Sequence, residues 1–264
     1  MIAAASTVLL LRDGPSGLEV FMVQRHRRSG FMPHAWVFPG GRVDAADALV
    51  DHAQVEGTGT LADRLGMPPA EAAGFGVAAV RETFEESGIW LGTGEPDDAR
   101  RKALHAGERT MAEVLEEGAG PIDLATLVPW ARWITPSAEK RRFDALFFAI
   151  AAQDAEGEHD FVETVDSRWV SPTEALASPI VDFPLAPPTW WTLRQLARFE
   201  GVVMALEAPP WEGRAVEPVI RFPEETIELL MPGHPEHPEA AVPGYPDRLT
   251  YETTWVAWRD DERL

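Results

Sequence analysis

The sequence predicts a mixed α/β (α+β) sandwich. Two runs of apolar, β-prone residues come first, at 3–11 and 18–24, and two more follow at 127–136 and 141–152. Between these pairs lies a stretch at 71–87 that is mostly compatible with a helix. Strands, then a helix, then further strands and helices are typical of a layered α/β domain with a mixed sheet.

Turn residues locate the elements of the first part of the chain. The segment Asp13-Gly14-Pro15-Ser16-Gly17 separates the first two strands as a turn. A strand-like stretch at 31–47 then leads into a loop at Pro39-Gly40-Gly41. Residues 48–69 are interpreted as an inserted excursion, which holds a short helix at 60–67.

Helix signals agree best over 71–87. Two prolines, Pro68 and Pro69, precede this stretch, Glu71 lies in its first turn, and Gly88 is placed to end it. Residues 97–117 are predicted to form a second helix, which is charged and amphipathic.

The second half of the chain alternates strands and short helices. A strand at 164–172 leads to a short helix at 172–178, and an amphipathic helix is expected at 187–202. Beyond about residue 205 the chain is rich in proline, with strands expected near 218–222 and 225–231 and a last one at 249–259. Prolines too dense for a helix make 231–248 a loop.

The chain length and these patterns divide the chain into a core and a tail. We expect one domain over 1–204, interrupted by an insertion at 48–80. Residues 205–264 form a C-terminal extension that is expected to pack on the same domain. The chain has 264 residues, which is enough for one large domain of this kind.

Composition excludes several classes of function. A formal net charge of -20 argues against a nucleic-acid-binding surface, because such domains usually carry a basic footprint. No apolar run approaches the ~18–20 residues needed to span a bilayer, and the first residues favour a strand over a signal peptide. The chain has no cysteine, so a reducing cytoplasm is the expected compartment. A homodimer is left open.

Three glutamates share one face of the predicted helix at 71–87. Glu82, Glu85 and Glu86 have the spacing i, i+3 and i+4, which places like charges roughly 5–6 Å apart at Cβ. Only Arg81 is close enough in sequence to offset them. Such a cluster is expected where a hard cation with oxygen ligands supplies the missing charge, so Mg²⁺ or Mn²⁺ suits it better than zinc.

A second cluster in the same chain shows that spacing alone is a weak signal. Glu113, Glu116 and Glu117 have the same i, i+3 and i+4 spacing. They lack a preceding arginine, a glycine two residues after the pair, and a glycine loop upstream. We expect them to form an ordinary exposed helix face.

Residues 81–89 read RETFEESGI and, with the loop upstream, resemble the signature of the Nudix hydrolase family. Gly41 and Asp47 have the spacing of the glycine and glutamate in the first half of that signature, after Phe38-Pro39-Gly40-Gly41. Two features depart from it. Asp47 replaces the glutamate, and thirty-three residues (48–80) separate Asp47 from Arg81, which is a long insertion for this signature. The long insertion resembles the coenzyme A diphosphatase subgroup of peroxisomal and mitochondrial type, with its bacterial relatives.

The resemblance implies a Nudix-type α/β/α sandwich and roles for individual residues. Glu82, Glu85 and Glu86 would bind Mg²⁺ (or Mn²⁺), with the Gly41 carbonyl as a further ligand. Glu82 is favoured as the general base and Glu163 is the rival. Arg81 would orient the glutamates, and Asp47 would either do the same from the loop or serve as a turn residue.

The implied reaction is hydrolysis of a diphosphate linkage in a small nucleoside diphosphate derivative. Coenzyme A or acyl-coenzyme A is the first hypothesis, and NADH or ADP-ribose is the alternative. A non-catalytic Nudix-fold binding module is a hypothesis of another class. The Gly40–Gly41 loop would cradle the diphosphate.

A 3′-phosphate on the substrate would need basic residues, and the sequence offers several near the loop and the later turn: Arg25, Arg27, Arg28, Arg42, Lys140, Arg141 and Arg142. Tryptophans could stack on adenine, although core packing is the commoner role: Trp36, Trp130, Trp133, Trp190 and Trp191. His234 and His237 have the spacing of a ligand pair, but we favour a surface loop for them.

Overall fold

A computed structural model describes residues 2–27, 32–51, 53–152, 155–223 and 226–264. Its central sheet is mixed, because β1 (Ala3–Gly14) runs parallel to β8 (Phe143–Ala151) and antiparallel to β2 (Gly17–Arg25). The other strands of this sheet are β3 (Trp36–Val37), β4 (Gly40–Arg42), β7 (Val128–Ile134) and β9 (Thr164–Val170). The predicted mixed sheet is confirmed.

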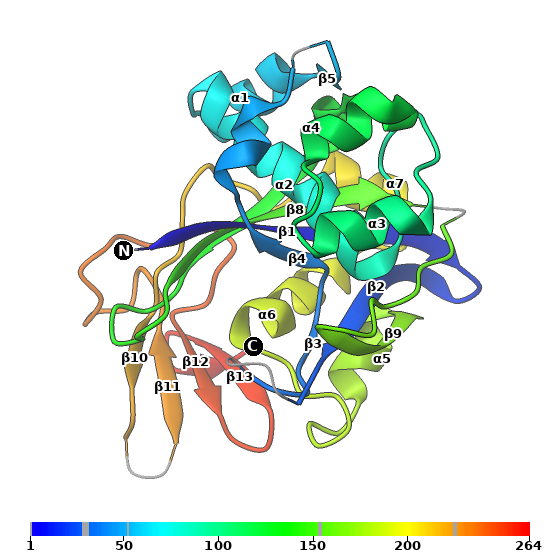
Figure 1. The fold of residues 1–264 in the computed structure, drawn as a ribbon. Coiled ribbons are helices and arrows are strands. Elements are labelled where there is room, and N and C mark those ends of the chain that lie inside the picture. The colour runs from blue at the N-terminus through cyan, green and yellow to red at the C-terminus, as the bar shows by residue number, and fades with distance from the viewer. Residues whose placement is uncertain (1, 28–31, 52, 153–154, 224–225) are drawn as a thin grey trace.

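Side chains alternate across this sheet with the period of two expected of strands, and each face is buried. Val8 and Leu10 of β1 pack into one apolar cluster, whereas Leu9 and Leu11 pack into another. Figure 1 shows helices on one side of β1 and β8, and α6 (Pro187–Leu196) with the C-terminal sheet on the other. The predicted layered sandwich is therefore confirmed.

Helices α1 (Thr58–Leu65) and α2 (Pro69–Ser87) cover the first face. Pro69 occupies the first turn of α2, and Gly88 ends it in the left-handed region with φ +71°, where its N–H donates to the Phe84 carbonyl at 2.9 Å. A Cβ at Gly76 would lie 2.8 Å from a Leu124 methyl, so glycine here permits close packing of the insertion. The helical insertion is confirmed.

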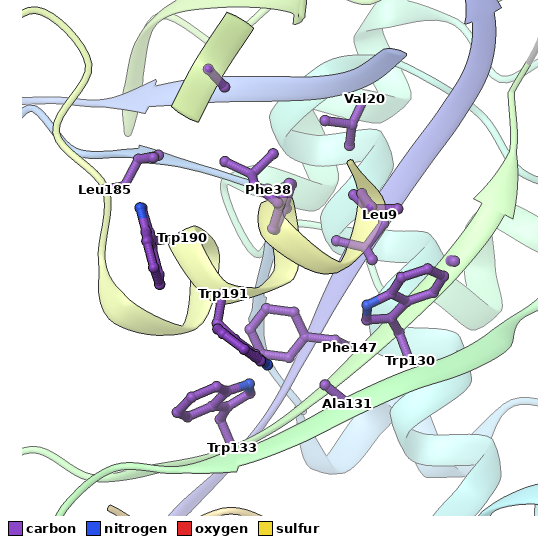
Figure 2. Close-up of a cluster of buried hydrophobic side chains, with 14 of the residues drawn as sticks. Leu9, Val20, Phe38, Trp130, Ala131, Trp133, Phe147, Leu185, Trp190 and Trp191 are labelled. Carbon is purple, nitrogen blue, oxygen red and sulfur yellow. The ribbon is translucent and has the colours of Figure 1, made fainter. Parts of the chain in front are cut away.

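The second face is covered by a cluster rich in tryptophan. Trp130, Trp133 and Phe147 of the sheet lie beside Trp190 and Trp191 of α6 (Figure 2). All four of these tryptophans are at most 7% exposed, and Trp36 is 1% exposed. These five tryptophans therefore belong to the core, which is the commoner role of buried aromatics, and among the five only Trp133 also lines the cavity described below.

The helix predicted over 97–117 is wrong as a single element. The structure has α3 (Asp98–His105) and α4 (Met111–Val114), followed by a π-helical turn at Leu115–Ala119. Gly107 adopts φ +68° and ends the first helix, and the Thr110 hydroxyl caps the second by accepting from the Glu113 N–H. A local left-handed residue therefore overrides the amphipathic pattern.

Two further predicted elements are split by turns. The helix expected over 187–202 is α6 followed by α7 (Val202–Glu207), and the strand expected at 249–259 is a hairpin of β12 (Arg248–Tyr251) and β13 (Trp255–Arg259). The remaining short elements are Ala45–Leu49 (a 3₁₀ turn), β5 (Val55–Glu56), β6 (Ile122–Asp123), Leu124–Thr126 (a 3₁₀ turn) and α5 (Pro172–Ala177).

The C-terminal extension forms a second, antiparallel sheet. Its strands are β10 (Val219–Arg221), β11 (Ile227–Leu230), β12, β13 and β14 (Glu262–Arg263). Leu229, Leu249 and Ala257 are paired neighbours on one face, and they belong to the same apolar cluster as Leu9. Trp255 also donates through its indole N–H to the Leu185 carbonyl at 3.0 Å.

No helix in the described ranges has the length and apolar character that crossing a membrane requires.

His237 lies in the 231–248 loop, where one ring nitrogen contacts the Glu217 carbonyl and the other accepts from the Glu239 N–H. These contacts give His237 a structural role in the loop and leave no ring nitrogen for a ligand shared with His234.

Because the two sheets share one apolar cluster, we propose that residues 1–204 and 205–264 fold as one unit. Leu249→Ala should lower the free energy of unfolding by about 2–5 kcal/mol in a single cooperative transition, since Leu249 is fully buried. Val203→Ala, at a 64% exposed position, should change it by less than about 0.5 kcal/mol. Urea unfolding followed by fluorescence and circular dichroism measures both. Separate transitions for the two parts would contradict the proposal.

Candidate active site

Strand β4 brings the glycine loop against β1 and the acidic helix. Gly40 pairs with Thr7 and Gly41 pairs with Ser6 of β1. A Cβ at Gly40 would lie 2.3 Å from the Ser6 carbonyl oxygen, and one at Gly41 would lie 2.4 Å from Cδ of Glu82. Glycine is therefore required at Gly40, where a side chain would meet backbone atoms, whereas a side chain at Gly41 would displace the Glu82 carboxylate that lies directly against it.

Arg81 is the centre of the polar network. Its Nε and Nη2 atoms donate to the two carboxylate oxygens of Asp47, each at 2.9 Å. Its Nη1 atom donates to Glu82 at 2.9 Å and to Glu85 at 3.3 Å, and Nη2 also donates to the Arg42 carbonyl at 2.8 Å. One guanidinium thus connects the loop to two of the three helix glutamates.

Asp47 has both of the roles that the sequence left open. Besides its paired bonds to Arg81, one of its oxygens accepts from the Asp44 N–H at 2.8 Å, which stabilises the start of the 3₁₀ turn at Ala45–Leu49. It is only 1% exposed. A shorter side chain than glutamate therefore spans the gap between the turn and the helix.

Glu86 contacts the same loop one turn after Glu82 on the helix. Its Oε2 atom accepts from the Gly40 N–H at 3.0 Å. Both Glu85 and Glu86 are 8% exposed. The glutamates of the other cluster, Glu113, Glu116 and Glu117, are all exposed, in agreement with the prediction of an ordinary helix face.

Burial makes the glutamates of α2 hard to ionise. Burial raises the pKa of Glu82 to about 7, although the positive charge of Arg81 opposes the shift. The pKa of Glu85 is raised for the same reason. Burial, together with the charge of Glu82, raises the pKa of Glu86 well above its ordinary value. Burial alone would lower the pKa of Arg81, but its bond to Asp47 and the surrounding carboxylates raise it overall.

The glutamates line a cavity of about 1090 Å³, together with Gly40, Gly41 and Arg81. Glu163 also lines this cavity from the loop before β9, and its charge helps to raise the pKa of Glu86. Asp160 holds this loop, because its carboxylate accepts from the backbone N–H groups of Val162, Glu163 and Thr164. The structure thus brings both predicted base candidates to one cavity.

Three residues around the site were missed by sequence reasoning. Arg101 of α3 donates to the Glu85 carbonyl at 3.0 Å and to the Glu158 carbonyl at 2.8 Å, so it joins the end of α2 to the later loop. His105 lines the cavity and lies 3.8 Å from Asp160. Asp160 is the third of these residues. The contacts of all three join distant segments, and only Asp160 had a local signal in the sequence, because aspartate is common in turns.

The basic candidates divide into two groups. Arg25, Arg42 and Arg141 line the cavity, and the Arg42 guanidinium lies 5.6 Å from the centre of the Phe143 ring. Arg142 instead pairs with Glu217 and donates to the Thr135 carbonyl, which makes it a structural residue. Arg27 and Lys140 are not among the lining residues, and Arg28 lies outside the described residues.

The donor chemistry of the site fits a hard divalent cation. Within the described ranges, no three acidic or histidine side chains are arranged as a preformed metal cluster. Two of the carboxylates of α2 are held by Arg81, and the third by the Gly40 N–H. The glutamates of α2 offer oxygen donors, and buried carboxylates with raised pKa values gain most from a nearby positive charge.

Comparisons with known proteins agree with this geometry. A protein-family model described as the NUDT19 Nudix domain matches residues 62–196. The chain is 28% identical to the acyl-coenzyme A diphosphatase NUDT19 of Xenopus laevis, over 86% of this chain and 73% of that protein. It is 32% identical to the protein of the same description from Gallus gallus, over 72% of this chain and 64% of that protein.

A solved structure shows the same fold. The crystal structure of a NUDIX hydrolase from Alicyclobacillus acidocaldarius aligns with a TM-score of 0.70 and 25% identity, over 79% of this chain and 97% of that chain. The resemblance to Nudix hydrolases and to the coenzyme A diphosphatase subgroup is thereby confirmed. The chain belongs to the Nudix hydrolase family, in the group described by the NUDT19 Nudix domain, and it is an enzyme of that family.

Proposed function

We propose that this enzyme hydrolyses the diphosphate linkage of coenzyme A or acyl-coenzyme A with the help of Mg²⁺ or Mn²⁺. The observation that carries the proposal is the packing of Glu82, Glu85 and Glu86 against the Gly40–Gly41 loop in the wall of one large cavity. The relatives named acyl-coenzyme A diphosphatase support the choice of substrate.

Glu82, Glu85 and Glu86, with the Gly41 carbonyl, are the proposed ligands of the cation. A bound divalent ion would polarise the phosphoryl oxygens and lower the pKa of a bound water. Arg81 is a positioning residue, because it fixes the carboxylates of Glu82 and Glu85 while Asp47 fixes its guanidinium. The N–H of Gly40 donates to the third carboxylate, that of Glu86.

Glu82 remains the favoured general base. Its pKa is raised to about 7 by burial, so its carboxylate can accept a proton near neutral pH. Glu163 is the rival, because it faces the same cavity from a loop whose backbone Asp160 holds in place. The side chain of Glu163 is exposed, whereas that of Glu82 is largely covered and hydrogen-bonded to Arg81.

Arg25 and Arg42 are the proposed ligands of a phosphate on the nucleoside, and Arg141 is a third candidate on the cavity wall. Fixed positive groups in this cavity would matter for an anionic substrate, because the chain as a whole carries a formal charge of -20. NADH and ADP-ribose remain alternatives that use the same chemistry. A non-catalytic module is disfavoured, because all three helix glutamates are present and buried or nearly so.

The substrate is tested by product identification. With Mg²⁺ as the sole metal, the enzyme should convert coenzyme A to an adenosine bisphosphate and a phosphopantetheine product, and it should convert NADH and ADP-ribose more slowly. Mass spectrometry of the products identifies the cleaved bond. Faster turnover of NADH or ADP-ribose than of any coenzyme A derivative would contradict the choice of substrate.

The same assay tests the glutamates. Glu85→Gln and Glu86→Gln should each lower kcat by about two orders of magnitude or more, because each removes a proposed cation ligand. Glu116→Gln is the matched control, since it changes an exposed glutamate of the second cluster and should retain wild-type turnover. Circular dichroism checks that the variants fold. Turnover near the wild-type level by Glu85→Gln or Glu86→Gln would exclude the assignment.

The raised pKa of Glu82 makes a prediction about stability. A carboxyl whose pKa rises from 4.5 to about 7 on folding stabilises the native state below pH 4.5 and loses that contribution as the pH rises through 7. In EDTA, Glu82→Gln should therefore gain melting temperature relative to wild type between pH 4.5 and 7. Mg²⁺ should reduce this gain at pH 7 by neutralising the wild-type carboxylate. A difference that is constant with pH would contradict the shift.

A further inference from the structure

The cavity that holds the glutamates extends into a crevice between the two sheets. One wall is the second face of the central sheet, where Ala5 and Thr7 of β1 pair with Ala145 and Phe147 of β8 and Trp133 follows on β7. The opposite wall is the C-terminal sheet, which contributes Ile220, Ile227, Leu229 and Trp255, with Ala186, Pro187 and Pro188 at the start of α6. We define these two walls as the inter-sheet crevice.

The walls of the inter-sheet crevice are almost entirely apolar. The four residues from the C-terminal sheet are aliphatic or aromatic, and Pro187 and Pro188 have no N–H to offer a ligand. The arginines that line the cavity belong to other segments: Arg25 to β2, Arg42 to β4, Arg81 to α2, Arg109 to the loop between α3 and α4, and Arg141 to the turn between β7 and β8. The cavity is therefore apolar in the inter-sheet crevice, and its charged groups lie on other segments.

Trp133 is buried on the central-sheet wall. Its side chain is 4% exposed, and its indole nitrogen is covered by protein atoms and has no hydrogen-bond partner among the described residues. Trp133 therefore offers no accessible donor to a ligand, and an apolar chain fits these walls.

A substrate held by its diphosphate at the glutamates has two arms to place in the cavity. The nucleoside arm carries hydroxyls and a phosphate, which would lose hydration in the inter-sheet crevice without charged or hydrogen-bonding groups to replace it. The other arm of an acylated substrate ends in a long hydrocarbon chain, whose burial is favourable. The polarity of the walls therefore favours the hydrocarbon chain, and not the nucleoside, in the inter-sheet crevice.

We infer that the inter-sheet crevice binds the acyl chain of a thioester substrate, with Ile220 of β10 as part of the wall against which the chain packs. The inference rests on the proposed function, because it presumes that the diphosphate lies at the glutamates of α2. It assigns the C-terminal extension a part in substrate selection, since β10, β11 and β13 supply one wall.

Strand β10 provides a matched pair of positions to test this. Val219 and Ile220 are adjacent and half-buried, and they point to opposite faces of the sheet, but only Ile220 lines the cavity. Ile220→Trp should lower kcat/KM for palmitoyl-coenzyme A by about tenfold or more relative to that for unacylated coenzyme A, since each methylene excluded from an apolar site costs about fourfold. Val219→Trp should leave this ratio within about twofold of wild type.

Ile227→Ser, at a second half-buried position on the wall, replaces Ile220→Trp if that variant fails to fold. It should lower the same ratio, because a hydroxyl replaces apolar surface. An unchanged ratio in folded variants, with normal turnover of coenzyme A, would overturn the inference while leaving the proposed function intact. A wild-type enzyme that cleaves no coenzyme A derivative would overturn the proposed function, and the inference with it.

Discussion

The site depends on one buried ion pair, the bidentate contact between the Arg81 guanidinium and the Asp47 carboxylate. Arg81 would be costly to bury alone, and so would the carboxylates beside it, but together they satisfy one another. Asp47 comes directly before the insertion and Arg81 lies in the helix that ends it. The pair therefore joins the two ends of residues 48–80, so that the loop and the helix glutamates meet despite the long stretch of chain between them.

The two apolar layers have different parts in the site. The layer with α2 fixes the helix that carries Arg81, and the layer with the C-terminal sheet supplies further walls of the cavity. One face of the central sheet carries α2, so the glutamates stand on a helix fixed by Phe75, Val80 and Phe84. The other face carries α6 and the C-terminal sheet. Because part of the cavity extends along this second face, the extension contributes walls that a core of residues 1–204 alone would leave open to solvent.

Local patterns predicted what local interactions decide. The strands at 3–11 and 18–24 follow from apolar, β-prone runs with turn residues between them, and the helix over 71–87 follows from the signals at its two ends. The motif RETFEESGI placed the glutamates on one helix. Contacts between distant segments could not be read in the same way. Only the fold brings together Arg142 and Glu217, or Arg101 and the Glu85 carbonyl. The same is true of Trp255, which lines the cavity that holds the glutamates.

The central claim is that the buried glutamates of α2 form a divalent-cation site, and direct binding tests it most simply. Mn²⁺ can be titrated into the metal-free protein and the free ion followed by electron paramagnetic resonance. Glu85→Gln and Glu86→Gln should weaken binding at least about tenfold, or about 1.4 kcal/mol, whereas Glu113→Gln in the exposed cluster should bind as wild type does. Equal affinity in all four proteins would contradict the account.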